Sequence, residues 1–119
     1  MAKDDYHVIV YQILAYLYSC LKKGAEVDPK QIGVESDYFK INGQAINRRY
    51  WEYIIYQLTN TGMIDGVVFA EVDNVRYPVP VKLDDCMITP LGIEYLTDNS
   101  FLKKAEKFLK ETKAIVPFV

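Results

Sequence analysis

The chain has 119 residues, which is enough for one domain built around one hydrophobic core. Half of the residues are hydrophobic and a quarter are charged, a balance that argues against disorder along most of the chain. The formal net charge of −2 and the sequence pI of about 5.4 argue against a protein that binds nucleic acid through bulk charge alone.

The charge is unevenly distributed along the chain. Residues 101–119 hold five lysines against two glutamates, a surplus of three positive charges. Because the whole chain carries −2, the other residues together carry −5. We therefore expect a basic last helix on an otherwise acidic domain. Lys103, Lys107 and Lys110 form either a solvated outer face or, if they lie on the same side as Arg48 and Arg49, a surface that supports DNA binding.

Few side chains are suited to a metal or to a membrane. Cys20, Cys86 and the single histidine, His7, are too scattered for a structural zinc site, which usually takes four Cys or His ligands. The start MAKDDYHV lacks the basic segment of a signal peptide, and the longest apolar stretch, 8–21, is too short to cross a bilayer. We therefore expect a cytoplasmic protein without metal, cofactor or membrane contact, in which Cys20 is a buried thiol.

The first predicted helix covers residues 5–23 and ends at Gly24, after two lysines that suit the negative end of a helix. Its apolar face repeats at helical spacing and consists of Tyr6, Ile9, Val10, Ile13, Leu14, Leu17, Cys20 and Leu21. A second apolar stripe on the same helix consists of Val8, Tyr11, Ala15 and Tyr18. This stripe needs cover, either from the last helix of the same chain or from a protein partner or second copy, which makes Val8, Tyr11 and Tyr18 candidate partner-binding residues.

Next in the chain, Asp28 and a proline in the first helical position predict a short helix over 29–32. Residues 35–45 contain a predicted turn at Asn42-Gly43, and their flanks fit either a short helix or a strand.

A central helix is predicted within "INRRYWEYIIYQLTNTGMIDG", residues 46–66, with Asn47 as its N-cap and Gly62 just past its end. A helical wheel at about 100° per residue places four residues on one face, which we expect to pack in the core against the first helix: Trp51, Ile54, Ile55 and Leu58. The opposite, exposed face consists of Arg49, Glu52, Tyr53, Tyr56 and Asn60, with Arg48 at its edge.

A strand is predicted over 66–72, followed by a turn at Asp73-Asn74. The run 77–81 contains two prolines and is predicted to be an edge strand or a loop, and 86–88 is predicted to be the returning strand. Thr89 is expected to cap a helix over 90–96, and Ser100 a helix over 101–113 whose core stripe consists of Phe101, Leu102, Ala105, Phe108 and Leu109. The apolar tail, 114–119, is expected to fold back or to meet a partner.

This order of elements predicts a single α+β domain over residues 1–119, a winged helix-turn-helix with an extra C-terminal helix. Three segments carry a resemblance to a known family: "YHVIVYQILAYLYSCLKKG", "YWEYIIYQLTNTGMIDGV" and "MITPLGIEYL". On these segments the chain resembles the YjcQ-like family of small winged-helix proteins from low-GC Gram-positive bacteria and their phages. The resemblance implies the fold and supplies no catalytic residues.

Two functions fit this scaffold. The first is regulatory binding of double-stranded DNA through Arg48, Arg49, Tyr53, Tyr56, Asn60 and Arg76, because arginine can pair with guanine or grip a phosphate. The second is protein binding without DNA, which the tyrosines, Glu52 and a slightly acidic wing favour. We do not expect an enzyme, since His7 has no assignable partner and there is no glycine-rich phosphate loop.

Overall fold

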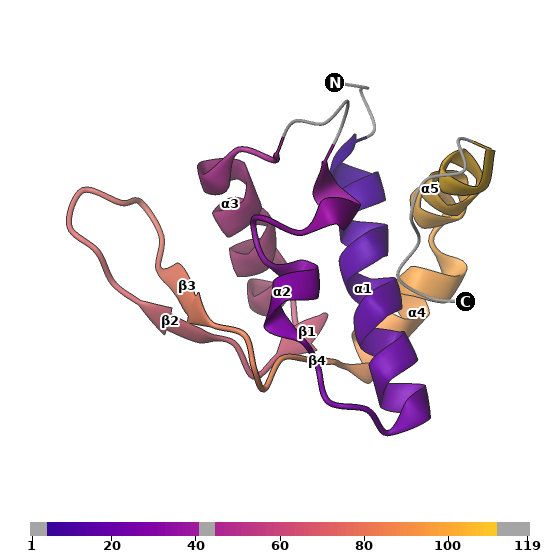
Figure 1. Cartoon of the computed structure of the whole chain (residues 1–119), viewed down its shortest axis with the longest axis horizontal. Coiled ribbons are helices and arrows are strands. Elements are labelled where there is room, and N and C mark those ends of the chain that lie inside the picture. The colour runs from indigo at the N-terminus through magenta and orange to yellow at the C-terminus, as the bar shows by residue number, and fades with distance from the viewer. Residues whose placement is uncertain (1–4, 41–44, 112–119) are drawn as a thin grey trace.

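The computed structural model describes residues 5–40 and 45–111, which form an α+β domain (Figure 1). In chain order, its elements are α1 (Asp5–Lys23), α2 (Pro29–Ile32), the 3₁₀ helix η1 (Asp37–Phe39), α3 (Arg48–Asn60), β1 (Ile64–Asp65), β2 (Val68–Ala70), β3 (Val79–Lys82), β4 (Met87–Ile88), α4 (Pro90–Asp98) and α5 (Ser100–Glu111). This architecture is compatible with the predicted winged helix. No helix in these described ranges is both long and apolar enough to cross a bilayer.

Helix α1 runs through the middle of the domain, and most of its predicted apolar face is buried, including Cys20. The prediction is wrong for Leu21, which is 45% exposed. Leu21 lies in the last turn of α1, which extends past α4 and α5 in Figure 1, so neighbouring helices cover only the earlier turns. Gly24 then turns the chain with a φ of +64°, and the amide of Ala25 donates to the Cys20 carbonyl.

The helix starts follow the predicted caps in three places. The side chains of Asp28, Asn47 and Thr89 accept hydrogen bonds from amides in the first turns of α2, α3 and α4. The cap of α5 is different from the prediction: Asn99, and not Ser100, accepts from the amides of Phe101 and Leu102, at 2.9 and 3.3 Å. Both residue types are good caps, and they are adjacent in the sequence.

Helices α4 and α5 pack on one side of α1, away from the strands (Figure 1). Leu102, Ala105 and Leu109 of α5 are buried, as predicted. Phe101 and Phe108 were expected in the same stripe but are 50% and 46% exposed. Each precedes a buried leucine by one residue, so its side chain points about 100° away from the buried stripe of α5. The predicted end of this helix at 113 and the tail 114–119 lie outside the described residues.

The strands form one long antiparallel hairpin in two parts, because β1 pairs with β4 and β2 pairs with β3. The predicted strand over 66–72 has the wrong bounds. Gly66 has a φ of +83° and lies against the Asp85 carbonyl. It divides this arm of the hairpin into β1, before it, and β2, after it. The run 77–81 supplies β3, in which Pro80 pairs opposite Phe69, and the returning strand is confirmed as β4.

Helix α3 lies between the hairpin and the rest of the helices (Figure 1). Its four predicted core residues are all buried, in a cluster that they share with α1. The indole Nε1–H of Trp51 donates to the carbonyl of Ile32 at 2.9 Å, which fixes α3 against α2. Between these helices, part of the ambiguous stretch 35–45 is the 3₁₀ helix η1, while the predicted turn at 42–43 lies outside the described residues.

Candidate nucleic-acid interface

The first turn of α3 presents two arginines to solvent. Arg48 and Arg49 are both exposed and follow directly after the cap residue. The cap orients this turn, since the Asn47 Oδ1 accepts from the amides of Arg49 and Tyr50 at 2.9 and 3.2 Å. Cations at this end oppose the helix dipole, at a cost of a few tenths of a kcal/mol each. Their guanidinium groups can donate to phosphate oxygens or to guanine.

Glu52 does not lie where the sequence predicted it. It was placed on the exposed face but is only 4% exposed. On the helical wheel it lies only about 60° from Ile55, which is buried, so it is at the border of the core face. Its Oε1 lies 3.7 Å from the Nη1 of Arg49 and has no hydrogen-bond partner among residues 5–40 and 45–111. The carboxylate therefore holds a negative charge just beneath the Arg49 guanidinium.

An aromatic cluster joins the hairpin to the exposed side of α3. Tyr77, at the start of the returning arm, donates its hydroxyl to the carbonyl of Arg49 at 3.1 Å. Its ring stacks on Tyr56, with centroids 5.5 Å apart, and meets Tyr53 at 6.1 Å. Phe69 of β2 meets the other side of Tyr56, edge to face at 6.3 Å. Because of these contacts Tyr56 is half-buried, whereas Tyr53 remains exposed.

These contacts decide which predicted site residues lie together. Arg76 is exposed and directly precedes Tyr77, whose hydroxyl donates to the Arg49 carbonyl, so the hairpin segment that carries Arg76 is attached to the first turn of α3. Asn60 is exposed at the opposite end of the helix, about 18 Å from Arg48 at 1.5 Å per residue. The sequence reasoning missed Tyr77 and Phe69. Both are aromatic residues among β-branched residues and prolines, a pattern that indicates strand residues with packing partners. The local sequence does not show which helix they contact.

The hairpin beside α3 is not basic overall. Arg76 and Lys82 are exposed, and so are the carboxylates of Glu71 and Asp73 near its tip. The hairpin therefore offers little net positive charge, whereas the first turn of α3 carries two adjacent exposed arginines.

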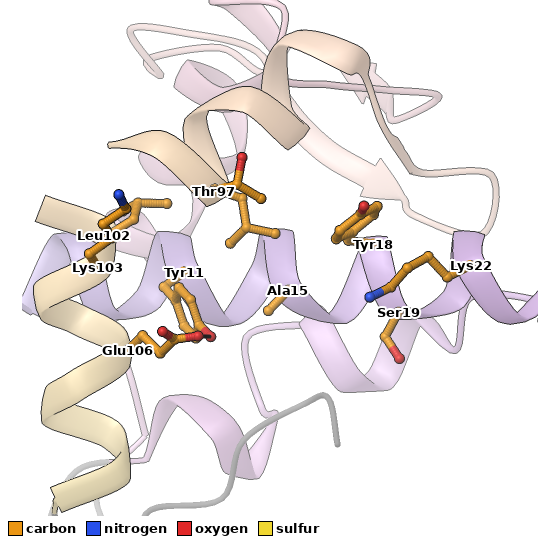
Figure 2. Close-up of a pocket in the computed structure, with 10 residues that line it drawn as sticks. Tyr11, Ala15, Tyr18, Ser19, Lys22, Thr97, Leu102, Lys103 and Glu106 are labelled. Carbon is orange, nitrogen blue, oxygen red and sulfur yellow. Dashed lines mark hydrogen bonds between the residues drawn. The ribbon is translucent and has the colours of Figure 1, made fainter. Parts of the chain in front are cut away.

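The predicted second stripe of α1 is only partly available to a partner. Tyr11 is buried beneath α5 and donates its hydroxyl to the Glu106 Oε2 at 2.8 Å, and Val8 is half-buried. Tyr18 borders a groove of about 500 Å³ between α1, α4 and α5 (Figure 2), with the Lys22 ammonium 4.4 Å from its ring centroid. Burial, and then the bond to Glu106, raises the pKa of Tyr11, so its hydroxyl remains a donor at neutral pH.

Both thiols lie inside the domain. Burial, and then the charge of Asp65, raises the pKa of Cys86 to about 12, so this thiol is a poor nucleophile near neutral pH. Within residues 5–40 and 45–111, no group of three or more His, Cys, Asp or Glu side chains is arranged to hold a metal ion.

Comparison with known proteins shows one family relationship. No curated protein and no solved structure matches the chain. A family model described as YjcQ protein matches residues 11–115, a range that contains all of α2 to α5 and most of α1. Since this match spans well over half of the sequence, the chain belongs to the YjcQ family.

Proposed function

We propose that this protein is a winged-helix protein that binds double-stranded DNA through the start of α3 and the adjoining hairpin. In such an arrangement, the first turns of α3 approach base edges in the major groove. The hairpin, as the wing, lies over the neighbouring phosphates.

One observation carries this proposal: two adjacent exposed arginines open α3, and the hairpin segment that carries a third, Arg76, is bonded to this end of the helix. Arg48 and Arg49 come from the helix itself, and Arg76 directly precedes Tyr77, whose hydroxyl donates to the Arg49 carbonyl at 3.1 Å. A local cluster of this kind can contact phosphates even on an acidic protein, because screening limits the effect of distant carboxylates beyond about 8 Å at physiological salt.

The proposal is tested by a salt titration on generic duplex DNA, followed by fluorescence anisotropy. Affinity should fall as salt rises, with a slope near 0.9 for each phosphate neutralised. The double change Arg48→Ala, Arg49→Ala should flatten this slope by up to about two units, because it removes two phosphate contacts.

A matched control removes two positive charges elsewhere. Lys107→Ala, Lys110→Ala changes the net charge equally on α5, which lies across α1 from the hairpin (Figure 1), and should leave the slope unchanged. If the wild-type protein shows no binding even at about 50 mM salt, DNA binding is ruled out, because non-specific affinity is strongest at low ionic strength.

A second candidate function is protein binding by the same hairpin. Val68, Val72 and Val81 are exposed large hydrophobic residues, and a surface that only follows a phosphate backbone has no use for them. The change Val72→Ser, Val81→Ser separates the two functions. If the arginines bind DNA, this variant should keep the DNA affinity of the wild type. If the exposed valines bind a protein partner, the variant should lose that partner.

A further inference from the structure

A second groove lies at the opposite end of α1 from its start, between the last turn of α1, the following loop and the 84–88 segment. Its volume is about 450 Å³. Leu17 and Ile88 contribute buried apolar surface to it. Leu21 and Met87 also border it, and they are 45% and 50% exposed. The groove therefore offers apolar surface to a partner. Part of that surface is Leu21, which was predicted to be buried in the core.

The border of this groove is acidic. Glu26, Asp84 and Asp85 line it and are exposed, and none of the lining residues in the described part of the chain is basic. The nearby Lys22 instead extends over the ring of Tyr18, towards the other groove (Figure 2), and Lys23 lies in the same last turn. The C-terminal end of α1 adds partial negative charge from its free carbonyls. An occupant that suits this groove is apolar and basic.

The outer side of α5 has that chemistry. Phe101 and Phe108 are seven residues apart and so lie on the same side of the helix, with Lys104 between them. Both rings are about half exposed, and the Lys104 ammonium lies 5.8 Å from the Phe101 centroid. Lys107 and Lys110 add positive charge, and they make long ion pairs of 3.9 and 3.8 Å with glutamates of the same helix. α5 thus presents two aromatic anchors within a basic surface.

These two surfaces cannot meet within one molecule. Phe101 stacks on His7 in the first turns of α1, with ring centroids 4.7 Å apart. Leu21 lies fourteen residues further along the same rigid helix, about 21 Å away at 1.5 Å per residue. A second copy of the chain can bring them together.

We propose that the protein associates with itself head to tail, with the Phe101–Lys104–Phe108 side of α5 in one copy docked in the acidic groove of the next. The aromatic rings pack against Leu21 and Met87, and the lysines face Glu26, Asp84 and Asp85. Such a contact joins two different surfaces, so a single contact leaves one surface of each kind open, and further copies can extend the assembly into rings or chains. The two patches are small, so the assembly is weak and depends on concentration.

The test is charge reversal, measured by sedimentation velocity over a wide range of protein concentration at low salt. The wild-type average mass should rise with concentration. The groove variant Asp84→Lys, Asp85→Lys and the helix variant Lys104→Glu, Lys107→Glu should each remain monomeric, because each places like charges on both surfaces. Mixed in equal amounts, the two variants should assemble again, since each supplies the surface that complements the other.

A control variant, Glu71→Lys, Asp73→Lys, makes the same change in net charge as the groove variant but places it at the hairpin tip. It should assemble as the wild type does. The proposal is overturned if the wild-type chain stays monomeric at every concentration, if the groove variant assembles on its own, or if the mixture of the two reversed variants stays monomeric. Circular dichroism of each variant shows that it is folded before the masses are compared.

Discussion

Gly66 lies where the two arms of the hairpin come closest, and it has a backbone conformation that favours glycine. Its φ is +83°, and a Cβ at this position would overlap the carbonyl oxygen of Asp85. We therefore expect Gly66→Ala to lower the free energy of unfolding by about 2 to 4 kcal/mol, from the left-handed backbone penalty together with the steric overlap. Urea denaturation measures this change.

Gly24 is the matched control for that substitution. Its φ is +64°, but a Cβ there would meet no atom within 4 Å. Gly24→Ala should therefore cost only the backbone penalty, about 1 kcal/mol. Equal losses for the two alanine variants would mean that the approach of Gly66 to Asp85 does not constrain the hairpin.

Glu52 is predicted from the helical pattern to be exposed but is buried, and this difference affects the proposed DNA-binding site. A buried carboxylate oxygen without a hydrogen bond is unfavourable, and its ion pair with the exposed Arg49 is long and solvent-screened. The same geometry places a negative charge directly behind a guanidinium that we propose to contact DNA. Glu52 thus weakens the local positive potential, while it restrains the direction in which Arg49 can point.

At the scale of elements, the attachment of the hairpin to α3 depends on Tyr77. Tyr77→Phe removes only the hydroxyl bond to the Arg49 carbonyl, an exposed bond that contributes about 0.5 to 1 kcal/mol. Tyr77→Ala also removes the ring contacts with Tyr56 and Tyr53, each of which contributes about 0.5 to 1.5 kcal/mol. Hydrogen exchange of β2 and β3 should accelerate about twofold to fivefold in the first variant and more than about tenfold in the second.

The amides of α1 are the internal reference for that experiment. They lie in the core and exchange through global unfolding, so their acceleration measures the loss of overall stability in each variant. If the hairpin amides of Tyr77→Ala exchange at the wild-type rate, then other contacts hold the hairpin against α3, and Tyr77 does not position Arg76.

Local signals explain which elements could be predicted from the sequence. The starts of α2, α3 and α4 depend on a cap side chain that bonds amides two or three residues away, so a few letters determine them. The burial of Leu21, Phe101 and Phe108 was predicted wrongly. Helical periodicity gives the direction of a side chain, but it does not show how much of that helix face a neighbouring element covers. The break at Gly66 depends on Asp85, nineteen residues away, which no local pattern reveals.

The same distinction applies to the candidate site. The exposure of Arg48 and Arg49 follows from their place in the first turn of a capped helix, which the sequence shows. The position of Arg76 depends on the Tyr77 hydroxyl reaching a carbonyl 28 residues earlier in the chain. That contact requires the fold, so the sequence named Arg76 as a candidate without showing that its segment is attached to the first turn of α3.

At the scale of the whole molecule, α5 is a structural part of the domain and not an accessory. It buries Leu102, Ala105 and Leu109 and covers Tyr11 of α1, to which Glu106 bonds. Each fully buried leucine contributes about 1.5 to 3 kcal/mol, a large share of the roughly 5 to 15 kcal/mol by which a domain is stable. Deleting residues 100–119 should therefore leave a chain that aggregates or unfolds at a much lower temperature.

Size-exclusion chromatography and thermal unfolding measure that outcome, and two further variants show where the loss comes from. Deleting only 112–119 separates the contribution of the helix from that of the residues that follow it. Replacing 71–76, at the hairpin tip, with Asn-Gly shortens the molecule without removing any of the buried core residues, so its unfolding temperature should stay within a few degrees of the wild type. A chain without residues 100–119 that remains monomeric and equally stable would mean that the core of this domain is complete without α5, and that the burial of Tyr11 contributes nothing to its stability.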